Sequence, residues 1–466
     1  MPPALRILHL GLGSFHRAHQ AAVMQRLQAL GDRRWELAGA NLRPDMADTL
    51  QALQRQGGAY TLVTVSPEGQ RRFERIEALR EVIGWQPALT RAIELAAEPD
   101  TRIVSLTVTE AGYCTDPRGR LDLQHPEVAA DLQGRTRQTV YGALAAMLKA
   151  RAHAHAGGLT LLNCDNLRSN GERLREWLLQ FIEAQGDREL LDWVQTYTTC
   201  PNAMVDRITP RPAPALQAQV LRATGWADAA PVLAEDFLQW VIEDRFCNGR
   251  PEWERAGVQL VHDVAPYEEA KIRILNATHS CIAWAGTLRG LHYIHEGVRD
   301  PAIRAMAQAY VGDDVIPCLH RPGHPSPVDL PAYRDTVLRR FANEAIADTN
   351  QRVAADGFAK LHGFILPTLR ERLARGESIA AVARLPALFL AFLQRWHAGA
   401  LPFAYQDQAM DPARAHALCA APDPLQAFAR EPALWGGLAG DERLLAALRA
   451  AQQEVSHFIS RQGASA

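Results

Sequence analysis

The sequence predicts an α/β fold, in which a doubly wound N-terminal domain is followed by a mostly α-helical C-terminal domain. Short apolar runs alternate with helical patterns over about the first 170 residues, and this alternation is typical of βαβ units around a parallel sheet. After about residue 255, strand-like runs become scarce. The 466 residues, 47% hydrophobic and 22% charged, have the composition of an ordinary globular protein. We therefore expect one domain over residues 1–256 and a second over residues 257–466.

Five apolar runs predict the strands of the N-terminal domain. They span Arg6–Leu12, Trp35–Asn41, Tyr60–Val65, Ile103–Val108 and Leu159–Cys164. Helical patterns lie between them at Ala18–Leu30, at about Asp45–Gln54 and near Val140–His153. Because crossovers between parallel strands are right-handed, we expect these runs to form one doubly wound parallel sheet.

Long helical patterns predict the C-terminal domain. The first is a mostly apolar segment at Pro266–Leu288, and others follow at Pro301–Val311, Tyr333–Asp356 and Ile379–Ala398. The proline-rich piece His320–Pro331 predicts a loop between two of these helices.

Charge and cysteine usage exclude several classes of protein. Fifty basic and 52 acidic residues give a net charge of −2, which gives no electrostatic reason to expect a nucleic-acid partner. No run of eighteen apolar residues predicts a membrane span, and the N-terminus has no charged region of the kind that precedes a signal peptide. The seven cysteines form no CxxC pair, so no metal site is predicted. We expect a cytoplasmic protein.

A glycine-rich turn at the first strand–helix junction points to a phosphate-bearing ligand. Gly11 and Gly13, followed by Ser14, Phe15 and His16, would let the backbone approach a pyrophosphate closely. The third glycine of a GxGxxG motif is replaced by His16, so the motif alone is weak. A glycine turn of any α/β protein is the competing interpretation, and the place of the turn after the first strand favours a dinucleotide.

Arg43 and Asp45 follow the second predicted strand. An acidic residue in this place often binds the ribose of the adenosine half of a dinucleotide. Asp45 is equally suited to begin the next helix as its N-cap. With Arg43 close by, the choice between NAD and NADP stays open, and NAD is favoured.

The string Asn163-Cys-Asp-Asn166 ends the fifth predicted strand. Ligands of doubly wound sheets bind beyond the carboxyl ends of strands, so these polar side chains are candidate site residues. The amide of Asn166 is a suitable donor to an oxygen that gains negative charge. Local turn chemistry explains Asp165 well and Asn166 less well.

Lysine is rare in this chain. Only Lys149, Lys271 and Lys360 are lysines among the fifty basic residues, and lysine, unlike arginine, loses its proton readily when buried. On an α-helix, Glu268, Lys271, Asn276 and His279 fall within one arc of about 140°, together with apolar residues. Burial disfavours the charged form of a lysine and lowers its pKa. Lys271 is therefore a candidate proton acceptor.

Arg352, Asp356 and Lys360 are spaced at i, i+4 and i+8. This spacing predicts that they share one helical face. A surface ladder of ion pairs is the competing interpretation, although it would use a second rare lysine. Asp206, in the polar string PNAMVDRITP, indicates nothing by itself.

Six strings together resemble one known family. LGLGSFHRAHQA, TVTEAGYC, CDNLRSNG, PNAMVDRITP, PYEEAKIRILNATHS and RVAADGFAK are similar to motifs of the polyol-specific long-chain dehydrogenases, the mannitol dehydrogenase family, in the same order. The resemblance implies a Rossmann-type N-terminal domain, a largely helical C-terminal domain and a monomer. It also implies NAD-linked, zinc-independent oxidation of a sugar alcohol to a ketose.

The resemblance implies a role for each matching residue. Lys271 corresponds to the catalytic lysine, Asn166 and Asn276 to a pair that stabilises the oxyanion, and Glu268 to a glutamate that gates the proton path. Positions around the substrate are matched by His279, Asp206, Arg352 and Lys360. Contacts to the cofactor are implied for Gly11, Gly13, Ser14, Phe15, His16, Arg43, Asp45 and Glu110. The segment Pro44-Asp45-Met46 matches the acidic pair that selects NAD only loosely.

The resemblance is compatible with three substrates. Oxidation of D-arabinitol to D-xylulose is the first expectation, and D-mannitol oxidation or fructuronate reduction are the alternatives. Two interpretations of another class are a zinc-dependent polyol dehydrogenase and a non-catalytic NAD-binding sensor.

Overall fold

The computed structural model describes residues 4–116 and 118–460, and only the backbone of Glu110 and Ala111. The chain divides into two compact units. The first takes in Met1–Ser66 and Gln70–Ala265, and the second takes in Pro67–Gly69 and Pro266–Ala466.

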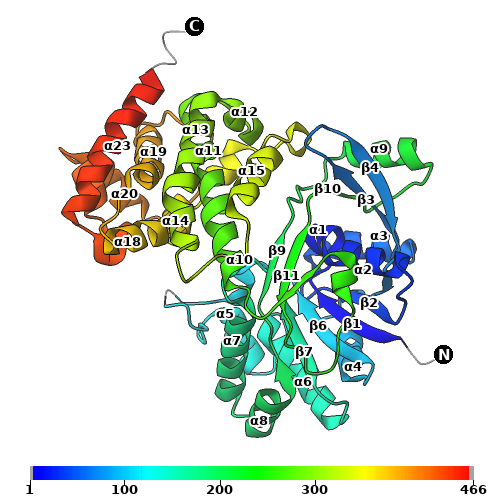
Figure 1. The fold of residues 1–466 in the computed structure, drawn as a ribbon. Helices are drawn as coiled ribbons and strands as arrows, with labels where there is room; N and C mark the ends of the chain where they lie inside the picture. Colours follow the sequence, from blue (N-terminus) through cyan, green and yellow to red (C-terminus); the bar gives the residue numbers. More distant parts are fainter. Residues whose placement is uncertain (1–3, 117, 461–466) are drawn as a thin grey trace. The chain divides into compact units, whose positions relative to one another are not determined.

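A parallel sheet forms the centre of the first unit (Figure 1). Over the described residues it has six strands in the order β5-β2-β1-β6-β7-β8, and all neighbours are parallel. The strands are β1 (Leu5–Leu10), β2 (Trp35–Ala40), β5 (Leu79–Val82), β6 (Thr101–Leu106), β7 (Leu159–Asn163) and β8 (Thr198–Thr199). From β1 the chain builds the sheet outward in both directions, as a doubly wound fold requires.

Each face of this sheet packs into its own hydrophobic core, which explains why the strands are almost continuously apolar. In β1, Ile7 belongs to one core and Leu8 to the other. The core that contains Ile7 includes residues of α2 (Gln20–Ala29) and α3 (Ala47–Arg55). The core that contains Leu8 includes residues of α4 (Thr90–Ala97), α6 (Val140–His153) and α7 (Asn170–Gln185).

The third predicted strand forms but does not join the parallel sheet, so that part of the prediction was wrong. β3 (Tyr60–Val65) pairs antiparallel with β4 (Arg71–Ile76) and parallel with β10 (Val232–Glu235) in a sheet of its own. Its connection to β4 is a short turn, which allows only antiparallel pairing, whereas a parallel neighbour needs a long crossover. β5, which sequence patterning missed, takes the edge position beside β2.

The remaining elements of the first unit surround these two sheets. A third sheet consists of β12 (Gln259–Val261), β11 (Gln239–Glu243) and β9 (Ala203–Asp206). The other helical elements are α1 (Ser14–Ala18), η1 (Pro44–Met46), η2 (Glu110–Tyr113), α5 (Pro126–Leu132), α8 (Arg188–Tyr197), α9 (Ala215–Thr224) and η3 (Trp253–Ala256).

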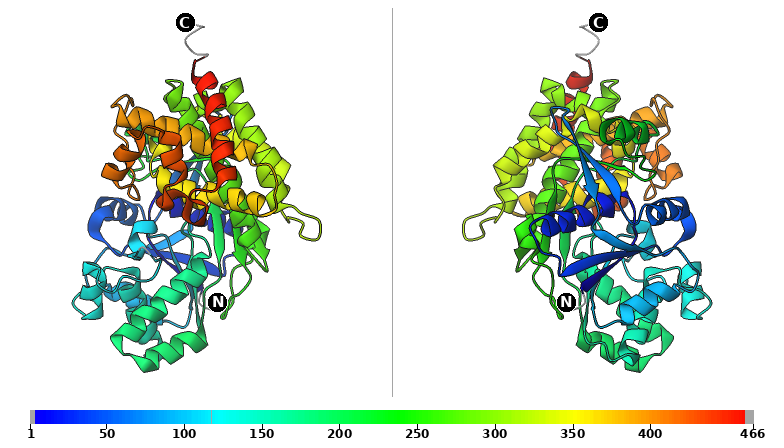
Figure 2. Two further views of the ribbon diagram at one scale, coloured as in Figure 1. Left: turned by 90° about the vertical axis from the view of Figure 1, so that its left-hand side faces the viewer. Right: turned by 90° about the vertical axis from the view of Figure 1, so that its right-hand side faces the viewer.

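Helices dominate the second unit. Apart from His279, every residue of α11 (Ala277–Leu288) is buried, and this helix contacts several others. The long helices α19 (Ala380–His397) and α23 (Glu442–Ser460) pack against each other (Figure 2). The other helices are α10 (Ala265–Ala270), α12 (Ile294–Arg299), α13 (Pro301–Ala309), α14 (Ile316–Leu319), α15 (Leu330–Phe341), α16 (Asn350–Ala354), α17 (Gly357–Lys360), α18 (Leu366–Ala374), α20 (Pro412–Cys419), α21 (Pro424–Ala429) and α22 (Pro432–Trp435). None of the described helices is both long and apolar enough to cross a membrane.

The single helix predicted over Tyr333–Asp356 is broken, and that prediction was wrong. α15 ends at Phe341, and α16 begins only at Asn350. The side chain of Asn343 accepts from Ala345 N, and that of Thr349 accepts from Arg352 N at 3.2 Å. Both are good N-caps, so the sequence contains two new helix starts inside the apparently periodic stretch.

Three stretches of the second unit are π-helical. They are η4 (Lys271–Asn276), η5 (Tyr310–Val315) and η7 (Leu361–Ile365), and η4 contacts both of the others. The buried hydroxyl of Tyr310 donates to the carbonyl of Arg273 at 2.9 Å. Arg273 Nε and Nη2 lie 2.6 Å from Glu269 and Glu371, respectively. These contacts hold the wide turn of η4 in place.

Candidate active site

A cavity of about 340 Å³ lies in the first unit beyond the carboxyl ends of β1, β2 and β6. The strand order reverses between β1 and β6, and ligands of doubly wound sheets bind at such a point. The cavity is lined by Gly11, Gly13, Asn41, Leu42, Arg43, Asp45, Met46, Thr107, Val108, Thr109, Gly112, Gln138 and Val140.

Gly11 and Gly13 give this cavity a backbone floor that a dinucleotide fits. Gly11 has φ +102°, and a Cβ there would lie 2.0 Å from Thr107 O, so no other residue fits without a shift of the backbone. A Cβ on Gly13 would meet nothing nearer than 3.9 Å, so the space above this glycine is open to a ligand. The bare backbone would let a pyrophosphate come close, as the sequence predicts.

The next three residues of the motif do not line the cavity. His16 is fully buried, with its ring stacked on His9 at 3.5 Å, and burial lowers the pKa of His16 well below its usual value. His9 Nε2 lies 3.1 Å from Gly11 O. Through His9, His16 supports the glycine turn from inside. Ser14 and Phe15 are half-buried at the start of α1.

Arg43 and Asp45 lie on the cavity wall, where the sequence predicts ribose contacts. Asp45 is exposed in η1, and Arg43 Nη2 donates to Glu127. Asn41, which sequence reasoning left out, accepts from Leu12 N at 2.6 Å and so ties the end of β2 to the glycine turn. A polar residue directly after a strand was the signal that could have found it.

Asp165 organises the loop after β6. Its carboxylate accepts from Val108 N at 2.9 Å, from Thr109 N at 3.1 Å and from the Tyr113 hydroxyl at 2.6 Å. Burial raises the pKa of Asp165, although these three donors oppose the shift. The backbone of Glu110 lies in this loop as part of η2. The side chain of Glu110 lies outside the part of the chain that the structure describes.

Asn166 lies in the loop after β7 and Asp206 is the last residue of β9, and one side chain joins these two segments. Asn166 is exposed after β7, and Asp206 is buried at the end of β9. Asn170 Nδ2 donates to Asp165 O at 3.0 Å and to Ala203 O at 2.8 Å. This amide fixes the loop that carries Asn166 to the strand that carries Asp206.

Lys271 and Asn276 lie at the two ends of η4, which changes the geometry predicted for them. In a regular α-helix, side chains five residues apart point about 140° away from each other. A π-helix closes its hydrogen bonds five residues along, so that the residue at i+5 lies about one turn beyond residue i. The π-turn therefore brings Lys271 and Asn276 toward one face. Lys271 is 9% exposed and Glu268, in α10, is 7% exposed.

His279 belongs to a charged cluster with two residues from the loop and helix after α15. Its Nε2 lies 3.2 Å from Asp348 Oδ2, and its ring stacks on Phe341 at 4.2 Å. Burial lowers the pKa of His279, although Asp348 opposes the shift. Arg352 donates to both carboxylate oxygens of Asp348, at 2.6 and 2.5 Å. Burial alone would raise the pKa of Asp348, but His279 and Arg352 hold it well below its usual range.

Lys360 approaches the same cluster, but not in the way its spacing predicts. Asp356 has φ +55° and lies between α16 and α17, where the helix is interrupted. Arg352, Asp356 and Lys360 therefore do not share one helical face as predicted. Lys360 Nζ instead donates to Val353 O at 2.8 Å, beside Arg352. Burial lowers the pKa of Lys360 to about 8, a shift that repulsion by Arg352 reinforces.

The second unit thus holds a buried lysine on the same π-turn as an amide, a largely buried imidazole paired with a carboxylate, and two cationic side chains. The lysine and the amide are suited to proton transfer at a hydroxyl, because an amine can accept the proton while an amide donates a hydrogen bond to the oxygen. The others are donors and acceptors suited to the hydroxyl groups of a polar substrate. Asp348 was not found from the sequence. Its position four residues before Arg352 is the only local signal for it.

The chain matches known proteins over nearly its whole length. A family model described as the mannitol dehydrogenase Rossmann domain matches residues 5–255, and one described as the mannitol dehydrogenase C-terminal domain matches residues 263–456. D-arabinitol 4-dehydrogenases of Ralstonia nicotianae and Klebsiella pneumoniae are 55% and 51% identical, respectively. The alignments cover 96% and 95% of this chain and 96% of each relative.

A solved structure is similar over the full length. It is the mannitol 2-dehydrogenase of Pseudomonas fluorescens in a ternary complex with NAD and D-mannitol. It is 32% identical, with a TM-score of 0.83, and the match covers 100% of this chain and 95% of that one.

Proposed function

The chain belongs to the mannitol dehydrogenase family, and from this premise we propose that it oxidises D-arabinitol at C4 to D-xylulose, with Lys271 as the general base. The resemblance seen in the six sequence strings is confirmed, as is the fold class. The protein is an NAD-dependent polyol dehydrogenase. The two D-arabinitol 4-dehydrogenases among its relatives support the choice of a pentitol.

The N-terminal domain, residues 1–256, is proposed to hold NAD. The backbone at Gly11 and Gly13 would face the pyrophosphate, and Asp45 and Arg43 would lie by the adenosine ribose. NAD, when bound, accepts a hydride from the carbinol carbon. The cavity beyond β1, β2 and β6 is what supports this assignment.

The C-terminal domain, residues 257–466, is proposed to supply the proton acceptor. Lys271, which is buried, in its neutral form takes the proton of the reacting hydroxyl as the C–H bond is broken. Asn276 and Asn166 donate hydrogen bonds to the same oxygen while it carries negative charge. Glu268 passes the proton on from Lys271. The single observation that carries the proposal is a buried lysine on the same π-turn as Asn276.

Four further residues are proposed to bind the other hydroxyl groups of the polyol. They are Asp206, His279, Arg352 and Lys360. His279 and Arg352 share Asp348 as a common partner, so that their side chains are held relative to each other. The charged side chains of Arg352 and Lys360 also suit a carboxylate, which keeps fructuronate as an alternative substrate.

The choice between the substrates depends on how the site treats one hydroxyl. D-mannitol has one carbinol more than D-arabinitol, and a site built for the pentitol must find room and hydrogen-bond partners for the extra hydroxyl. The two D-arabinitol 4-dehydrogenases among the relatives favour the pentitol. We expect kcat/KM to be higher for D-arabinitol than for D-mannitol or fructuronate, measured with NAD under one set of conditions. A higher value for D-mannitol would contradict the proposed substrate and leave the proposed mechanism standing.

Catalysis is proposed to need no metal ion. The proton acceptor is an amine, and the oxyanion accepts hydrogen bonds from two amides, so that no Lewis acid is required. We expect turnover to survive dialysis against a strong chelator with a loss of less than twofold. A loss of activity that added zinc restores would favour a zinc-dependent dehydrogenase. Binding of NAD without turnover on any pentitol or hexitol would favour a sensor.

The protein is proposed to act as a cytoplasmic monomer. All seven cysteines are unpaired, which suits a reducing compartment. The monomeric state is proposed from the family resemblance.

A further inference from the structure

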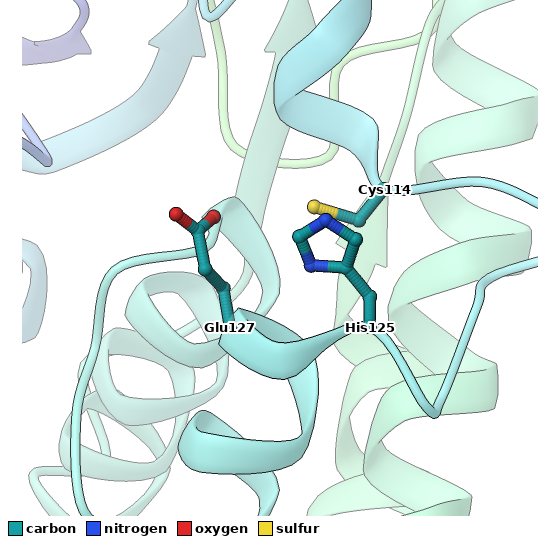
Figure 3. Close-up of side chains that lie close together, drawn as sticks. All are labelled: Cys114, His125 and Glu127. Carbon is teal, nitrogen blue, oxygen red and sulfur yellow. The ribbon is translucent and has the colours of Figure 1, made fainter.

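Cys114, His125 and Glu127 bring three metal-binding atoms together in the first unit. The thiol, one imidazole nitrogen and one carboxylate oxygen all lie within 4.8 Å of one another. Figure 3 shows Cys114 after η2 converging with His125 and Glu127 at the start of α5. This cluster contains none of the residues proposed for proton transfer, and no CxxC motif indicates it in the sequence.

The local fold holds these residues together. The chain doubles back after Cys114, because Asp122 N donates to Cys114 O at 2.9 Å and Thr115 forms an antiparallel bridge with Leu121. His125 N then donates to Asp122 O at 3.1 Å. Backbone hydrogen bonds thus bring Cys114 close to the start of α5.

The donor set suits one class of ion. Thiolate, imidazole and carboxylate are the ligands of zinc and of similar borderline divalent ions, with bonds of about 2.0–2.3 Å. Ligand atoms around such an ion are roughly 3.3–3.8 Å apart, so the cluster must close by about an ångström. His125 and Glu127 are half-buried, which leaves them room to do so.

A second observation concerns the ring nitrogen Nδ1 of His125. His125 Nδ1 is buried, and no hydrogen-bond partner lies within reach of it among the described residues. Buried polar atoms are nearly always paired, and an orphan of this kind is commonly explained by an ion or a water. His125 begins α5, but its side chain makes no cap hydrogen bond, so helix capping does not account for its position.

We propose that Cys114, His125 and Glu127 bind one divalent cation of the zinc class, with water in the remaining position. Glu127 also accepts from Arg43, which lines the cofactor cavity. The guanidinium repels a cation held by the same carboxylate, so Arg43 weakens the site. Binding of the cation is thereby coupled to Arg43 in the wall of the cofactor cavity.

Cobalt(II) is the probe for this site, because a bound thiolate gives it an intense charge-transfer absorption. Chelator-treated full-length protein, titrated with Co²⁺, should bind one equivalent with this absorption, and Zn²⁺ should abolish it by displacement. His125→Ala and Glu127→Gln should each weaken Co²⁺ binding tenfold or more, and Cys114→Ser should abolish the charge-transfer band. Cys247→Ser, at the exposed cysteine, is the matched control and should bind like wild type.

The outcomes separate the proposal from adventitious binding. Loss of the absorption in Cys247→Ser, or wild-type binding by both His125→Ala and Glu127→Gln, would overturn the site. These two variants change half-buried side chains, so the test does not depend on the folding of Cys114→Ser. Arg43→Gln should tighten Co²⁺ binding severalfold, and an unchanged or weaker affinity would overturn the coupling to the cavity.

Discussion

Replacing Lys271 with alanine is expected to lower kcat for polyol oxidation by several orders of magnitude. General base catalysis alone is worth about 10²–10⁴-fold, and Lys271 is buried. The Kd for NAD should change little, because the cofactor cavity is formed by other residues. The measurements are steady-state kinetics with D-arabinitol and a fluorescence titration with NADH.

Two variants and one additive sharpen this test. Lys149→Ala is the matched control, since Lys149 is a surface lysine that pairs with Asp187, and it should keep wild-type turnover. Lys271→Arg should be as inactive as the alanine variant, because a guanidinium does not give up its proton. Small primary amines added to Lys271→Ala should restore part of the rate. Turnover of Lys271→Ala within tenfold of wild type would rule out the general-base role.

Alanine at Asn166 or at Asn276 is expected to lower kcat by about 10²–10³-fold, as the loss of one oxyanion donor does elsewhere. Because both amides are proposed to serve one oxygen, the double variant should lose much less than the product of the two single effects. Steady-state kinetics of all four proteins complete the cycle.

The distribution of these losses between kcat and KM decides what the two amides do. Losses that multiply and appear only in KM would mean that the two amides bind substrate uniformly and have no special part in the transition state. An unchanged Kd for NAD in each variant would show that the cofactor cavity is intact.

The sequence predicted those strands of the main sheet whose apolar pattern matches their buried position. β1, β2, β6 and β7 are mostly apolar because both faces of the sheet are buried, and this signal is visible in the sequence. β3 carries the same signal but belongs to another sheet, since strand pairing depends on the length of the following turn. Periodicity therefore located this strand but did not give its partner.

The candidate site was predictable where the backbone requires a special residue. Gly11 was found because a tight turn after the first strand needs a glycine, and Lys271 was found because lysine is rare in this chain. The π-turn between Lys271 and Asn276 was not predictable, because helical periodicity was counted at 3.6 residues per turn. Asp348 was missed because its partner His279 lies on a distant helix, and only the folded chain brings the two together.

The π-turn at Lys271–Asn276 also sets the phase of the helix around it. A turn that closes over five residues holds one residue more than an α-helical turn would need. The extra residue is absorbed within this one turn, so the helix on either side keeps the phase of an uninterrupted α-helix that is one residue shorter. His279 and the apolar side of α11 therefore keep their orientation relative to Glu268. Length changes are tolerated in most surface loops, whereas in this buried helix the π-turn is what accommodates an additional residue.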